Sequence, residues 1–146
     1  MIITVQKMKE VFAYCNKMYF GGKMARPKLS TGRSTYYVAR VYCIPNYETR
    51  RCGGIRIRFS EMYDFTEEEL INIMCHEMIH LHLYRRFIIE KEEHGPRWRQ
   101  MANELNEKYG LHITESANLK QIGELTFFEK INQFIFHTFF FKPLTA

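Results

Sequence analysis

The sequence predicts an α+β fold, built from a first helix, a small antiparallel sheet, a second helix and a supporting third helix. Three observations indicate this class. Apolar residues recur at helical spacing near residues 3–20, 67–87 and 96–110. Between the first two of these segments, "GGIRIRFS" alternates apolar and basic residues, as a half-buried strand with a basic outer face does. The chain has 146 residues, which suffices for one domain with its own hydrophobic core.

The composition is that of a globular protein. Hydrophobic residues make up 46% of the chain and aromatic residues 15%, which argues against disorder. A formal charge of +5 is compatible with an acidic partner such as DNA but does not by itself establish one. The first residues, "MIITVQKMKEVFAY", lack the continuous apolar run of a signal peptide, and no segment is long and apolar enough to cross a bilayer. We therefore expect a cytoplasmic protein without a membrane partner.

The four cysteines are scattered along the chain and form no CxxC pair. In a cytoplasmic protein they are expected to be reduced thiols. Cys43 and Cys52 could face each other across a hairpin and bind metal or oxidise, but unpaired thiols are the preferred interpretation. Cys75 lies on the second predicted helix and is expected to pack in the core.

The first half of the chain is expected to form one helix and the sheet. The pair Gly21-Gly22 should end the helix over residues 3–20, because glycine accepts the left-handed conformation found at helix C-termini. Residues 26–43 then favour extended structure with a turn near Thr31-Gly32. The stretch "IPNYETRRCGG" is typical of a turn, so a hairpin with the strand over residues 53–60 is plausible.

Two further helices follow. Thr66 and Glu69 fit a capping box at the start of the second helix. Pro96 fits the first position of the third helix, which should run to Gly110. One face of the second helix carries Leu70, Ile73, Met74, Glu77, His80, Leu81 and Tyr84. Polar side chains in the middle of that apolar face need an explanation.

The C-terminal part of the chain is aromatic. The stretch "LHITESANLKQIGEL" is expected to form a short edge segment and a linker. The tail "TFFEKINQFIFHTFFFKPLTA" holds seven phenylalanines. We expect it to pack against the core, with a dimer contact or a segment lying in a groove as the alternatives.

The stretch "CHEMIHLHLY" carries the strongest functional signal. His76 and His80 are four residues apart, so on a helix they lie on one face, one turn apart. Their imidazole nitrogens can therefore meet at one point, and zinc is suited to such ligands. Glu77 lies beside the first histidine, placed to reach a water on the metal, as in zinc peptidases. Burying these groups without compensation would cost several kcal/mol, and a metal would supply the compensation.

A catalytic zinc ion needs a third protein ligand and an open position for water. His94 is the best candidate. A helix that continues to Phe87 carries the chain roughly 10 Å past His80, and the residues from there to His94 can span roughly 23 Å. Gly95 would permit a tight turn just before the third helix begins. The alternatives are the oxygen ligands Glu90, Glu92 and Glu93.

Other candidate residues have weaker patterns. The remaining histidines face another side of the helix or lie outside any metal-like spacing: His82, His112 and His137. Several arginines could contact phosphates or merely form a solvated basic face: Arg50, Arg51, Arg56 and Arg58. Trp98, flanked by Arg97 and Arg99, fits the apolar face of the third helix and is expected to pack in the core.

The motif "HEMIH" followed by "HGPRW" and the helix "WRQMANELN" resembles the SprT-like metallopeptidase domain. Upstream, "NKMYFGGKM", "PKLS" and "GGIRIRFS" resemble that family's first helix with its glycine pair, its first strand and the strand before the active-site helix. The match covers roughly residues 3–115. The family is related to Spartan, a protease that degrades proteins crosslinked to DNA. The resemblance implies a zincin-like single domain over residues 1–118.

The resemblance also implies roles for individual residues. His76, His80 and His94 would bind Zn²⁺, and Glu77 would be the catalytic base. Residues 119–146 depart from the family pattern, because this tail has no cysteine and so no zinc ribbon. The implied function is that of an HExxH-type zinc metallopeptidase acting on protein or peptide substrates, including DNA-associated proteins reached through the basic surface. The alternative is a non-catalytic, zinc-stabilised adaptor that binds nucleic acid and does not need Glu77.

Overall fold

The computed structural model describes residues 1–135 and confirms the α+β class. Along the chain the elements are α1 (Val5–Tyr19), β1 (Lys28–Gly32), β2 (Ala39–Asn46), β3 (Arg51–Ser60), α2 (Glu67–Arg85), α3 (Pro96–Tyr109) and α4 (Phe127–Ile135). The expected capping box of Thr66 and Glu69 is present at the start of α2. Gly21 and Gly22 follow α1 with φ angles of 77° and 74°, so the glycine pair ends that helix as predicted.

The sheet has three strands in the order β1-β3-β2, with β3 in the centre. Strands β2 and β3 form the expected antiparallel hairpin. The prediction of a wholly antiparallel sheet is wrong, because β1 runs parallel to β3. A turn at residues 31–32 would have paired β1 with β2. Instead β3 lies between them, and it contributes the fully buried side chains of Ile57 and Phe59 to the core.

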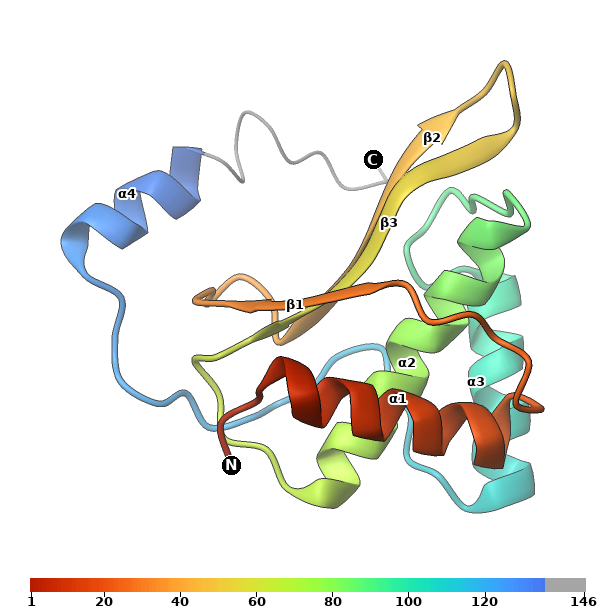
Figure 1. Ribbon diagram of the computed structural model, residues 1–146, viewed down its shortest axis with the longest axis horizontal. Coiled ribbons are helices and arrows are strands. Elements are labelled where there is room, and N and C mark those ends of the chain that lie inside the picture. The colour runs from red at the N-terminus through yellow and green to blue at the C-terminus, as the bar shows by residue number, and fades with distance from the viewer. Residues whose placement is uncertain (136–146) are drawn as a thin grey trace.

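Helices α1, α2 and α3 form a layer on one side of the sheet (Figure 1). Helix α2 contacts β2 and β3, while α1 contacts both α2 and β1. Helix α3 packs against α2, so α2 lies at the centre of the domain. Its side chains Leu70, Met74, Met78 and Ile79 are completely buried. Any polar group on α2 that faces inward is therefore held away from water by its neighbours.

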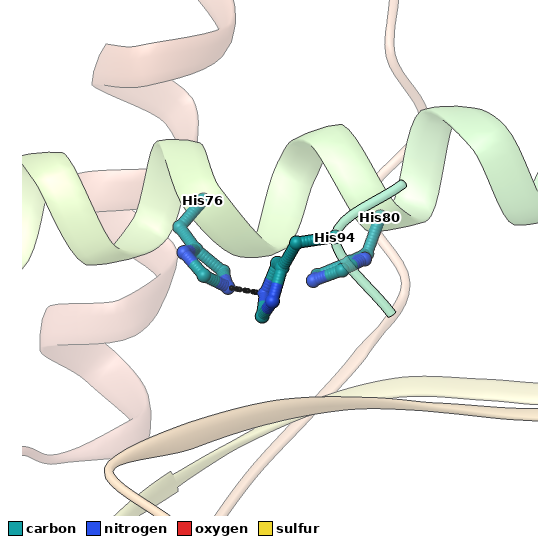
Figure 2. A group of neighbouring side chains, drawn as sticks. All are labelled: His76, His80 and His94. Atoms are coloured by element: carbon teal, nitrogen blue, oxygen red, sulfur yellow. Dashed lines mark hydrogen bonds between the residues drawn. The ribbon is translucent and has the colours of Figure 1, made fainter. Parts of the chain in front are cut away.

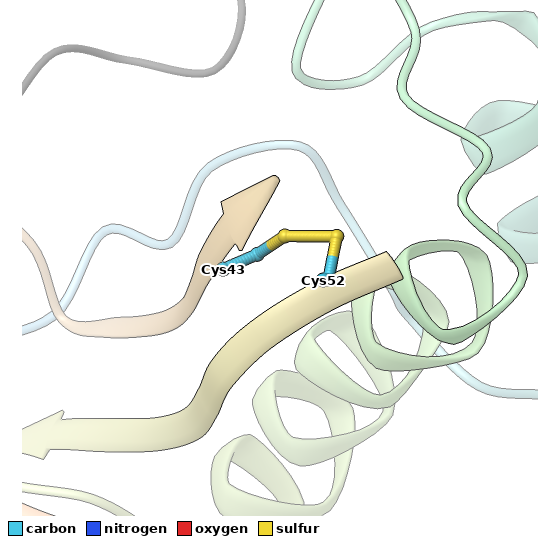
Figure 3. The surroundings of a disulfide bond; sticks show 2 residues. All are labelled: Cys43 and Cys52. Atoms are coloured by element: carbon cyan, nitrogen blue, oxygen red, sulfur yellow. A yellow bond between two sulfur atoms is a disulfide. The ribbon is translucent and has the colours of Figure 1, made fainter. Parts of the chain in front are cut away.

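A disulfide bond between Cys43 and Cys52 joins β2 to β3 (Figure 3). The expectation of four reduced thiols is therefore wrong for this pair. The two cysteines lie across the hairpin with their Cα atoms 5.4 Å apart, beside an irregularity in the strand register at Tyr42 and Ile44. Cys15 and Cys75 are free and buried, so core packing of Cys75 is confirmed.

The segment between α3 and α4, residues 110–126, contacts the rest of the domain before α4 begins. Gln121 forms a β-bridge with Tyr63, and Leu125 is buried. Helix α4 then lies apart from the other three helices (Figure 1). The phenylalanines of α4 are exposed, so the prediction that the tail packs against the core is wrong for residues 127–135. Residues 136–146, which include His137, lie outside the described residues. Within residues 1–135, none of the helices has the length and apolar character needed to span a membrane.

Candidate metal centre

Helix α2 places His76 and His80 one turn apart, on the side that faces the segment carrying His94 (Figure 2). Trp98 of α3 contacts both rings from the same side. His80 and Glu77 are each only 4% exposed. This burial follows from the position of α2, which is covered by α1, by the sheet and by α3. The polar side chains of Glu77 and His80 are therefore buried within the apolar face of α2, as the sequence pattern indicated.

The loop after α2 brings His94 to the same place. Glu90 fixes this loop, because its carboxylate accepts hydrogen bonds from the backbone nitrogens of Arg97 (3.0 Å) and Trp98 (3.1 Å) at the start of α3. A Cβ atom at Gly95 would lie 2.7 Å from the Glu90 carboxylate, so a larger residue there would displace that carboxylate from the nitrogens of α3. The backbone φ of Gly95 is an ordinary −73°, so the expected tight turn is not the reason for a glycine at this position.

The three histidines form one compact cluster (Figure 2). One ring nitrogen from each of His76, His80 and His94 lies within 4.8 Å of the others. The Nε2 atoms of His76 and His94 are 3.1 Å apart. Among the described residues, this is the group of side chains that could hold a metal ion.

The protonation state of the cluster suits a metal ligand. Burial, together with the charge of His94, lowers the pKa of His76 to about 4. Burial likewise lowers the pKa of His94, and that of His80 falls well below its ordinary value through burial and the neighbouring histidines. The rings are therefore neutral at physiological pH, which is the form that coordinates metals.

A hydrogen bond orients the His76 ring, and the ring of His80 has a nitrogen without a partner among the described residues. The Nδ1 atom of His76 lies 2.7 Å from the carbonyl oxygen of Thr114 and donates to it, which leaves Nε2 with a free lone pair. The Nε2 atom of His80 is buried and has no hydrogen-bond partner within residues 1–135. An unsatisfied buried nitrogen is costly, and a bound cation would satisfy it. Three neutral imidazoles form a donor set that zinc and other late transition metals accept.

Trp98 supports the cluster from α3. Its ring centroid lies 4.5 Å from that of His94, 4.6 Å from that of His76 and 5.6 Å from that of His80. Its Nε1 atom donates to the backbone carbonyl of His76 at 3.4 Å. Core packing of Trp98 is confirmed, since it is 2% exposed. Sequence periodicity placed this ring in the core but carried no signal for its contact with all three histidines.

Glu77 lies beside the cluster, with a carboxylate oxygen 3.9 Å from Nε2 of His76. Burial raises its pKa to about 8; the charge of Glu93 adds to this increase and Arg40 opposes it. Glu77, His76 and His94 line a cleft of about 710 Å³, as do Tyr36 and Arg40. The influence of Arg40 was not visible in the sequence, because it depends on how β2 lies against α2.

The other candidate ligands have different roles. Glu90 caps α3, and Glu92 pairs with Arg99 at 3.6 Å. Glu93 lines the cleft without joining the histidine cluster. His82 contacts Arg86 at 2.9 Å, on another side of α2. His112 lines the same cleft and is not in the cluster.

Comparison with known families agrees with this geometry. The family model described as the SprT-like family matches residues 8–117, which contain most of α1, the sheet, α2, α3 and all three clustered histidines. No curated protein sequence matches the chain.

Proposed function

The chain belongs to the SprT-like family, and we propose that it is a zinc metallopeptidase of the HExxH type with a zincin-like active-site helix. One observation carries the proposal: three neutral histidines converge on one point while a buried glutamate lies beside them at the wall of a cleft. A structural zinc site would be closed by a fourth protein ligand. Here the cluster has three members within the described residues and borders a space large enough for a peptide.

His76, His80 and His94 would hold the metal ion, and Glu77 would handle protons. When bound, Zn²⁺ supplies polarisation of the scissile carbonyl and acidification of a water molecule. A nearby divalent cation favours the ionised form of a carboxyl group, which counteracts the effect of burial on Glu77. The carboxylate of Glu77 then accepts the proton of the attacking water and passes it to the leaving amine.

The position of β2 supports a peptide substrate. Among residues 1–135 it is an edge strand, because the sheet order is β1-β3-β2. Val38, Ala39 and Arg40, at the start of this strand, line the same cleft as Glu77. An extended substrate could add to this edge through main-chain hydrogen bonds, which read little sequence.

We also propose DNA as a partner, through the outer face of the sheet. Arg56 and Arg58 line a second hollow of about 440 Å³ there, together with Tyr37, Tyr42 and the ion pair of Arg33 with Glu129. Guanidinium groups beside aromatic rings suit phosphates and unstacked bases. Affinity should fall steeply as salt rises, and binding that is insensitive to salt would argue against phosphate contacts.

The test of the proposed activity is the substitution Glu77→Gln, which preserves shape but removes basicity. Cleavage of an unstructured protein is measured in zinc-loaded samples, with and without single-stranded DNA. We expect the wild type to cut and the variant to be slower by roughly a hundredfold or more. Glu68→Gln is the matched control, because Glu68 lines the same cleft but lies outside the cluster.

Two outcomes would contradict the proposal. Equal cleavage by the wild type and Glu77→Gln would remove Glu77 from the mechanism. No cleavage by zinc-loaded wild type under either condition would favour the non-catalytic nucleic-acid adaptor.

A further inference from the structure

Helix α4 faces the domain with its polar side. The Arg33 side chain donates to the Glu129 carboxylate through Nε (2.7 Å) and Nη2 (3.4 Å). One turn later, Gln133 accepts from the Thr35 backbone nitrogen at 3.1 Å and donates to the Arg33 carbonyl at 3.0 Å. Thr126 and Glu129 exchange hydrogen bonds of 3.1 Å at the start of the helix. These contacts fix which side of α4 points away from the domain.

The outward side of α4 is apolar. Its exposed residues are Phe127 (80%), Phe128 (72%), Ile131 (39%), Phe134 (56%) and Ile135 (41%). An amphipathic helix on a monomeric domain normally buries its apolar stripe and shows its polar side to water. The reverse orientation, with several large side chains on one contiguous stripe, marks a surface that another molecule covers.

We propose that a second copy of this chain covers the apolar stripe of α4, in an antiparallel two-fold pairing of the two helices. The stripe has the symmetry that such a pairing needs. Counted from Ile131, apolar residues stand three and four positions away in both directions, at Phe127 and Phe128 on one side and at Phe134 and Ile135 on the other. Reversing the helix therefore places Phe128 opposite Phe134 of the partner and brings Ile131 close to its own copy. A two-fold interface must be self-complementary in this way.

The exposed area is sufficient for such a pair. An aromatic side chain offers about 150–250 Å². Because the three phenylalanines are 56–80% exposed, they present roughly 300–500 Å² per chain. With the two isoleucines included, a pair would bury on the order of 1,000 Å², which is about the lower bound for a specific protein interface.

The charges of α4 favour this occupant over the others. The helix has two charged side chains, Glu129 and Lys130, and Glu129 is held by Arg33. A membrane-surface helix normally carries several basic residues on a polar side that faces water, whereas here the polar side faces the protein. Within residues 127–135, a strongly charged partner would meet the single charge of Lys130 in addition to the Glu129 carboxylate that Arg33 holds.

The first experiment measures the mass of the full chain by sedimentation equilibrium over a wide concentration range. We expect a dimer that dissociates on dilution. Phe128→Ser and Phe134→Ser should each weaken it at least tenfold, with unchanged thermal unfolding of the monomer. Ile44→Ser is the control, since Ile44 is 70% exposed on β2 and should leave the dimer intact. A wild type that stays monomeric overturns the proposal, as does monomer that instead binds phosphatidylcholine–phosphatidylserine vesicles.

The second experiment tests the geometry without depending on loss of binding. Ile131→Cys should crosslink rapidly to its own copy on mild oxidation. Phe127→Cys should crosslink slowly, because the two copies of residue 127 lie roughly 12 Å apart along the helix axis in an antiparallel pair centred on residue 131. Equal crosslinking at the two positions, or faster crosslinking at residue 127, would overturn the pairing.

Discussion

Helices α2 and α4 break the usual division between apolar interior and polar surface in opposite directions. Helix α2 buries polar side chains, Glu77 and His80, inside an otherwise apolar core. Helix α4 exposes apolar side chains, of which Phe127 and Phe128 are the most accessible. Each arrangement is unfavourable for the isolated chain, and each becomes favourable when a missing component is supplied. For α2 that component is a cation, and for α4 it is another apolar surface.

The comparison shows why function can be located from violations of folding rules. A buried histidine nitrogen without a partner and an exposed phenylalanine both cost free energy in the isolated fold. Chains tolerate such costs mainly where binding or catalysis requires them. The site on α2 packs against the core and opens into the cleft, whereas α4 is attached through a few polar contacts at one edge. Substitutions should therefore have very different effects in the two regions.

The largest contrast is expected between two aromatic residues. Trp98→Ala should lower the free energy of unfolding by about 3–5 kcal/mol, because it leaves a cavity under the histidine cluster. Phe128→Ala should change it by no more than about 0.5 kcal/mol in the monomer, because the ring is exposed. Urea denaturation at low protein concentration measures both values. Similar losses for the two variants would mean that α4 belongs to the core.

A smaller effect is expected in the loop that holds His94. Glu90→Ala removes the acceptor for two backbone nitrogens of α3 and should cost about 1 kcal/mol of stability. It should also weaken zinc binding by roughly tenfold or more, because the loop that positions His94 loses its anchor. Glu92→Ala is the control, since that side chain is 73% exposed in its ion pair with Arg99. Competition with a chelating dye gives the zinc affinity, and an unchanged value in Glu90→Ala would contradict the positioning role.

The smallest effect concerns the attachment of α4 at low pH. The hydrogen bond from Arg33 lowers the pKa of Glu129 from its ordinary 4.5 to about 2, with a further contribution from the Thr126 backbone. The carboxylate therefore stabilises the docked helix fully above pH 4.5, and this contribution is lost as the pH falls through about 2. In Arg33→Ala the Glu129 carboxyl, followed by NMR, should titrate closer to 4.5. An unchanged midpoint would show that Arg33 does not hold the helix.

The sequence predicted the local features of this fold better than the long-range ones. The capping box at Thr66 and the glycine pair after α1 are set by neighbouring residues, and both are present. The parallel pairing of β1 and the Cys43–Cys52 bond depend on strand order and register, which local patterns do not encode. The amphipathic pattern of α4 likewise defines an apolar side but not the direction in which it points.

In the candidate site too, the local features could be predicted from the sequence and the long-range contacts could not. Helical spacing was sufficient to place His76 and His80 on one side of α2, and chain length made His94 reachable. The structure brings all three together. The contacts of Trp98 and the Thr114 carbonyl with the cluster could not be predicted, because they come from segments that are distant in sequence.

The central claim is that His76, His80 and His94 together bind one metal ion. Zinc content per chain, measured by mass spectrometry of the metal after dialysis, tests it most directly. The wild type should retain about one zinc ion per chain, and His94→Ala should lose most of it, because two histidines hold the metal poorly. His82→Ala, which removes a histidine of α2 outside the cluster, should keep the wild-type content. Full zinc occupancy in His94→Ala, or none in the wild type, would contradict the account.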